Sequence, residues 1–94
     1  MKLYEIVALV LEEEMPKEIA VDLIMESCGP EVVADLYQVY HDLTDCSKEA
    51  GAQRRAAYER QDWSAFGWHN YAANVLTRQW LLAMELWIAL PESW

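Results

Sequence analysis

The chain has 94 residues and a formal net charge of −9, with sixteen acidic residues against seven basic ones. Eleven of the acidic residues lie in positions 1–46, where Lys2 and Lys17 are the only basic residues, so this half carries the whole net charge. An acidic surface repels nucleic acid and anionic membranes and attracts basic proteins, so we expect no direct nucleic-acid or membrane binding. The composition is 54% hydrophobic, which excludes a disordered acidic tail and favours one folded domain over residues 1–94.

We expect neither an export signal nor a membrane span. The N-terminal apolar run is interrupted by Glu5 and followed by the acidic residues 12–14, unlike a signal peptide. The most apolar segment, residues 80–90, is about half the roughly 20 residues that cross a bilayer. We therefore expect a cytoplasmic protein in which Cys28 and Cys46 are free thiols.

Proline and glycine residues divide the chain into four expected helices. The first, over residues 2–15, ends at Pro16, and a second, amphipathic helix continues to Gly29 and Pro30. Acidic residues recur every four positions in the second helix and apolar residues occupy its opposite side. No segment keeps the period-two alternation that is typical of a strand, so we predict an all-α fold.

The third helix is expected to be long, from Pro30 to about Gln61, and the sequence leaves open whether it is continuous through Gly51. Its buried side is marked by an apolar stripe with three- and four-residue spacing: Val32, Leu36, Val39, Leu43, Cys46 and Ala50. Residues 48–60 are rich in alanine, arginine and glutamate, which favour helix. With the last helix it forms a long helical hairpin at the C-terminal side of a compact bundle of about four helices.

The last helix is expected to begin at a cap supplied by Asp62 or Ser64 and to end at Leu90. It is apolar on two faces, and such a helix is either wrapped by the other helices or buried against a second subunit. One face carries tryptophans seven residues apart, at positions 80, 87 and 94. The candidate self-association residues of a homodimer are Trp80, Met84 and Trp87.

The main functional candidate is a row of carboxylates on the third helix, opposite its apolar stripe. We call the following residues the acidic stripe: Glu31, Asp35, Asp42, Asp45 and Glu49. The row covers about 27 Å at 1.5 Å per residue, with carboxylates at helical spacing roughly 5 to 6 Å apart. Phosphates along a nucleic-acid strand also lie several ångströms apart and meet rows of lysine and arginine. The stripe therefore predicts a partner-binding site that imitates nucleic acid on a basic protein surface; a solvated helix face is the alternative.

Small, acidic, single-domain chains without a catalytic motif are similar in profile to phage-encoded inhibitors of host defence, including anti-CRISPR proteins. This resemblance of class implies a viral inhibitor or adaptor that acts by protein binding. The sequence has no glycine-rich phosphate loop, no nucleophile elbow and no pair of residues at zinc-site spacing. We accordingly expect no enzymatic activity, no metal and no cofactor.

An alternative site lies around the expected bend between the last two helices. Arg54 and Arg55 can make bidentate phosphate contacts, and Tyr58 and Trp68 offer stacking faces. We call these four residues the anion cluster, because together they are suited to an anion-binding module that sequesters a signalling nucleotide. The competing interpretation is that the aromatic residues seal the hairpin and Arg55 pairs with Glu59.

A second alternative is a magnesium-dependent enzyme. The order of acidic residues before His41 resembles the all-α nucleotide pyrophosphohydrolases: Glu12, Glu13, Glu14, Glu18, Glu31 and Asp35. The resemblance implies carboxylates from two helices that hold Mg²⁺ against a nucleoside triphosphate. The chain departs from the family pattern in two places. Its acids on the later helix are four residues apart where the family has three, and Pro16 interrupts the earlier helix.

Overall fold

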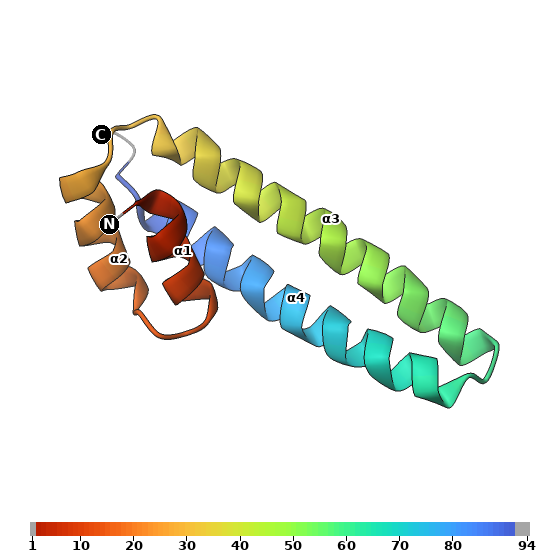
Figure 1. Cartoon of the computed structure of the whole chain (residues 1–94). Coiled ribbons are helices and arrows are strands. Elements are labelled where there is room, and N and C mark those ends of the chain that lie inside the picture. Colours follow the sequence, from red (N-terminus) through yellow and green to blue (C-terminus); the bar gives the residue numbers. More distant parts are fainter. Residues whose placement is uncertain (1, 92–94) are drawn as a thin grey trace.

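The computed structural model describes residues 2–91 and contains four helices, so the predicted all-α class is confirmed. The helices are α1 (Leu3–Leu11), α2 (Lys17–Ser27), α3 (Val32–Glu59) and α4 (Trp63–Ala89). α3 and α4 form a long antiparallel hairpin, and the two short helices pack at the end opposite the α3–α4 turn (Figure 1). The principal extents are 50 × 22 × 17 Å. Within residues 2–91 no helix has the length and apolar character needed to cross a membrane.

The hydrophobic core lies where all four helices meet. Its members are nearly inaccessible to solvent: Ile6, Val7, Val10, Ala20, Ile24, Val32, Leu36, Leu86 and Leu90. Farther along the hairpin the buried residues are small, for example Ala57 and Ala73. Burial of large side chains is therefore concentrated at one end of the molecule, and we expect local opening to begin at the other end, near the α3–α4 turn.

α1 ends at Leu11, so the predicted continuation of this helix to Met15 is wrong. Glu13 has a φ of 60°, in the left-handed region. Its N–H donates to the carbonyl of Val10 at 3.0 Å, and the next N–H donates to the carbonyl of Leu9 at 2.9 Å. These two bonds form a Schellman motif, which ends a helix by satisfying its last carbonyl groups. Glutamate occupies the position where glycine usually signals such an end.

α3 is continuous through Gly51, a point that the sequence leaves open, and α4 begins at Asp62, one of its two predicted caps. The Asp62 carboxylate accepts a hydrogen bond from the N–H of Ala65 at 3.2 Å. The end of α3 is a second Schellman motif. In it Gln61, with a φ of 56°, donates through its N–H to the carbonyl of Tyr58 at 3.0 Å. A three-residue connection, Arg60 to Asp62, therefore turns the chain between the two long helices.

Replacing Gln61 with glycine is expected to raise the free energy of unfolding by about 1 kcal/mol. A left-handed backbone costs a non-glycine residue about 1–2 kcal/mol, and glycine removes most of that cost at the expense of a more flexible unfolded chain. Urea unfolding followed by circular dichroism measures the change. Gln61→Ala is the matched control, since alanine retains the steric penalty. An equal gain from alanine would contradict the explanation.

One residue of the predicted apolar stripe, Cys46, is exposed to solvent. Val39 and Cys46 lie seven residues apart, so they occupy the same edge of α3. Val39 is half-buried because it packs against the four-helix core, whereas Cys46 lies beyond that core and is exposed. The assignment of Cys46 to the buried side is therefore wrong. Cys28 and Cys46 are both free, as predicted.

Candidate functional site

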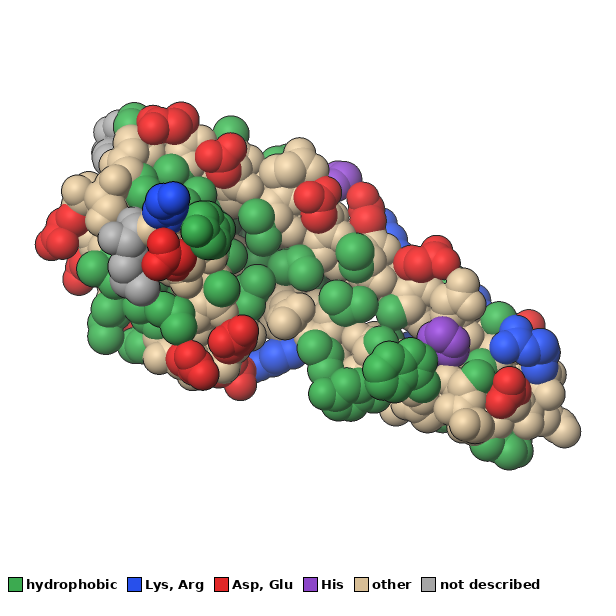
Figure 2. All heavy atoms as spheres, viewed as in Figure 1, with side chains coloured by type: hydrophobic (Ala, Val, Ile, Leu, Met, Phe, Trp, Pro, Cys, Tyr) green, Lys and Arg blue, Asp and Glu red, His purple; other side chains and the backbone are tan. Residues whose placement is uncertain are grey.

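The acidic stripe lies along one side of a single continuous helix. Glu31 is the N-cap residue of α3, and the other four residues lie within the helix. At 3.6 residues per turn the five positions fall within a sector of about 80°. All five residues are exposed, and Figure 2 shows acidic side chains in a row along this arm of the hairpin. The helix therefore presents the five carboxylates to solvent on one side, with a wider gap of about 10.5 Å along the axis between Asp35 and Asp42.

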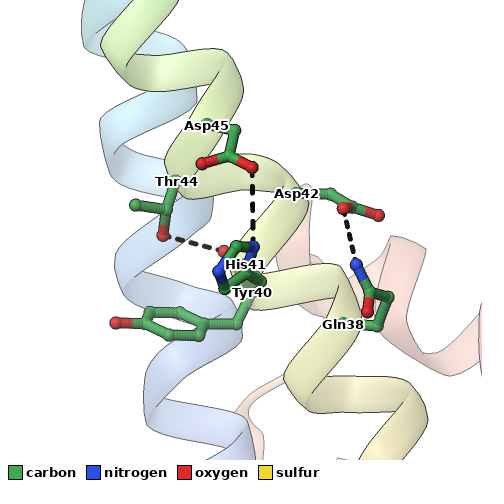
Figure 3. Close-up of polar contacts among 6 residues, drawn as sticks. All are labelled: Gln38, Tyr40, His41, Asp42, Thr44 and Asp45. Atoms are coloured by element: carbon green, nitrogen blue, oxygen red, sulfur yellow. Dashed lines mark hydrogen bonds and ion pairs between the residues drawn. The ribbon is translucent and has the colours of Figure 1, made fainter.

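Uncharged or weakly basic side chains make the local contacts of the stripe. Three of its carboxylates meet a side chain one helical turn away: Asp42 with Gln38 at 2.8 Å, Asp45 with His41 at 3.5 Å and Glu49 with Gln53 at 3.0 Å. Figure 3 shows the first two contacts. Within residues 2–91 no lysine or arginine forms an ion pair with the stripe. Among the described residues, the negative charge of the stripe is therefore not paired with a lysine or arginine.

A second row of exposed acidic residues lies on α2, at Glu18, Asp22 and Glu26. α2 has 11 residues, against 28 in α3. Acidic residues also surround the turn between α1 and α2, where Glu13 forms an ion pair with Arg78 of α4. The α3 row is therefore the longer of the two rows of helical carboxylates, with five residues against three.

Tyr58 of the anion cluster lies between Arg54 and Arg55 on one side of α3, but the four members differ in burial and in the residues they contact. Arg54 is half-buried against α4, and its Nη1 donates to Asn70 Oδ1 at 3.3 Å. Arg55 is exposed and lies 100° farther round the helix. Tyr58 packs near Trp63 instead, with ring centroids 5.7 Å apart. Trp68, on α4, has Tyr71 as its aromatic neighbour, at 6.3 Å. No aromatic contact or hydrogen bond among residues 2–91 joins the four members of the cluster.

The candidate self-association residues lie in the seam between α3 and α4. Trp80, Met84 and Trp87 are half-buried. Tyr40 of α3 stacks with both tryptophans, at centroid distances of 5.8 Å to Trp80 and 6.0 Å to Trp87. Tyr37 lies 5.2 Å from Trp87. The tryptophan rings therefore pack within one chain, while the homodimer stays a prediction. The related Trp94 is outside the described residues.

The acids that resemble a pyrophosphohydrolase site come from two separate segments. Residues 12–14 lie at the turn after α1 and Glu18 lies in the first turn of α2. Glu31 is the N-cap of α3 and Asp35 lies in its first turn. Glu13 is engaged by Arg78. Within the described residues no group of three or more His, Cys, Asp or Glu side chains is placed to hold a metal ion.

Sequence reasoning missed a hollow between α1 and α3, which we call the α1–α3 groove. It is lined by six apolar or aromatic residues: Leu3, Tyr4, Val7, Ala8, Leu11 and Val39. The relevant signal was present in the spacing of Leu3, Val7 and Leu11, which places them on one side of the first helix. That signal does not say which helix lies opposite, because the packing of α1 is decided by tertiary contacts.

Comparison of the chain with known protein families, with curated proteins and with solved structures found no match.

Proposed function

We propose that the protein is an acidic protein-binding inhibitor or adaptor that covers a basic, nucleic-acid-binding surface of its partner. The observation that carries this proposal is the acidic stripe. Its five exposed carboxylates lie along one side of a 28-residue helix and its N-cap, without an ion pair to lysine or arginine among residues 2–91. A rigid helix holds such a row at fixed spacing without any further ordering on binding, which favours association with a complementary row of basic side chains.

The charge pattern supports a binding role better than a stabilising one. Like charges at four-residue spacing destabilise a helix by a few tenths of a kcal/mol per pair, and interleaved lysine would remove that cost. Binding of a basic partner would offset this repulsion between the carboxylates. The interaction should have a fast association rate and should weaken as salt screens the charges.

The wider proposal is that the protein belongs to the class of phage-type inhibitors of host defence, acting in the cytoplasm on a nucleic-acid-binding complex. Nucleic-acid mimicry suits such a role, because a single small chain can occupy a channel that is already lined with lysine and arginine. The small size and the net charge of −9 support this class. Under this proposal the protein acts by occupancy and needs no catalytic residue.

Immobilised protein and a cell lysate provide the test. Proteins bound through the acidic stripe should elute at raised salt and should also be displaced by duplex DNA, because DNA and the stripe compete for the same basic surface. Elution by salt identifies electrostatic binding, and displacement by DNA identifies mimicry. If excess duplex DNA displaces none of the salt-sensitive proteins, the mimicry proposal is refuted.

A further inference from the structure

The α1–α3 groove lies directly beside the acidic stripe. Val7 forms part of its lining and is 6% exposed, while Tyr4 at its edge is 68% exposed. The walls include Leu3 and Leu11 of α1 and Val39 of α3. These three side chains are partly buried and pack against the core. Figure 2 shows hydrophobic side chains on this face, between the N-terminal helices and the acidic row of α3. The groove is thus apolar and open to solvent, and most of its lining residues belong to the core or pack against it.

Two carboxylates of the stripe border this groove. Asp35 is four residues before Val39 and Asp42 is three residues after it, so they lie about 40° and 60° from Val39 around the helix axis. The acidic stripe is therefore beside this part of the apolar stripe, and the expectation that the two lie on opposite sides is wrong here. Both aspartates are exposed. Figure 3 shows Asp42 on the side of α3 away from Tyr40, which faces α4. An apolar trough with acidic residues along one edge is the complement of a helix that is apolar on one face and basic beside it.

We propose that the α1–α3 groove receives a basic amphipathic helix of the partner protein. Apolar side chains of that helix, spaced three and four residues apart, fill the groove, as in other complexes where a helix binds in a groove. Its lysine or arginine residues face Asp35 and Asp42. The inference rests on the proposed function, because it uses part of the same acidic stripe, and it adds a partner chemistry that nucleic-acid mimicry alone does not require.

Charge argues against the other occupants of the groove. Nucleic acid and anionic lipid would bring negative charge against Asp35 and Asp42. A second copy would bring another strongly acidic chain, since the net charge of each is −9. A groove of this kind also gives specificity, because charge alone attracts any basic protein whereas apolar spacing selects a particular helix.

Two synthetic peptides distinguish binding in the groove from binding by charge alone. The first is a 14-residue leucine and lysine peptide with leucine at helical three- and four-residue spacing, and the second has the same composition in a permuted order. Calorimetric titration at 150 mM salt should give a dissociation constant at least tenfold lower for the amphipathic peptide. Equal affinity for both peptides would overturn the groove inference and leave the proposed function standing. Failure of both peptides to bind, even at 50 mM salt, would overturn the inference and count against the proposed function.

A groove-filling substitution gives the second test. Ala8→Trp places a large side chain in the groove from an exposed position, so the fold should tolerate it. We expect it to remove the tenfold preference for the amphipathic peptide. Ala34→Trp, at an exposed position of α3 outside the groove lining, is the matched control and should preserve the preference. Circular dichroism verifies helix content in both variants. Retention of the preference in Ala8→Trp would overturn the inference, as would sedimentation showing a dimer of this chain that Ala8→Trp dissociates.

Discussion

Replacing Asp35, Asp42 and Asp45 with lysine is expected to weaken binding to a basic partner about 100-fold at 50 mM salt. An exposed ion pair contributes up to about 1 kcal/mol, so reversal of three such charges removes about 3 kcal/mol, which corresponds to roughly 100-fold in affinity. All three residues are exposed, so helix content should not change. The permuted leucine and lysine peptide is the appropriate probe, because it reports charge without groove specificity.

A matched control distinguishes the acidic stripe from net charge. Glu18, Asp22 and Glu26 are also exposed on a helix at regular spacing, and their replacement with lysine changes the net charge by the same amount. We expect this second variant to bind the probe less than tenfold more weakly than the unmodified protein. If the two triple variants lose affinity equally, binding depends on net charge alone, and the acidic stripe is not the site.

Replacing Leu86 with alanine is expected to lower the free energy of unfolding by about 2 to 5 kcal/mol, through lost apolar burial and the cavity left behind. Leu86 is fully buried in the core cluster to which all four helices contribute. A domain of this length has a total stability of roughly 5 to 14 kcal/mol, so this one change removes a large part of it. Urea unfolding followed by circular dichroism measures the loss, with an unchanged denaturant slope indicating that unfolding remains two-state.

The control for this substitution is Leu81→Ala on the same helix. Leu81 is half-buried and lies outside the core cluster, so the chemical change is identical while the loss of burial is smaller. We expect a cost of about 1 kcal/mol, well below that at Leu86. Equal destabilisation by the two substitutions would contradict the placement of the core at the four-helix end.

The long helices could be predicted because their signals are local. The apolar residues of α3 recur with helical spacing up to Ala50, and residues 48–60 are rich in residues that favour helix. One glycine costs only about 1 kcal/mol in a helix, and the structure shows that α3 continues through Gly51. The start of α4 followed from Asp62, a residue whose carboxylate suits the free N–H groups of a first turn. Such features depend on a few neighbouring residues, so a single sequence contains them.

The end of α1 could not be predicted in the same way. Its signal would have been glycine at residue 13, and the chain has glutamate there in a left-handed conformation. The side chain of Glu13 accepts a hydrogen bond from Arg78, 65 residues farther along the chain. A contact over that distance is created by the packing of α1 against α4, and no local pattern records it.

The same distinction between local sequence signals and tertiary packing applies to the candidate site. The sequence alone determined the acidic stripe, because five carboxylates on one continuous helix share a face whatever packs on the other side. Only the tertiary structure decided which surface borders the stripe, since docking of α1 beside Val39 creates the groove. It also separated Arg54 from Arg55, because α4 covers one side of α3 and leaves the other to solvent. Helical periodicity places residues around an axis, whereas burial depends on which helix lies opposite, and that is settled by the packing of all four helices together.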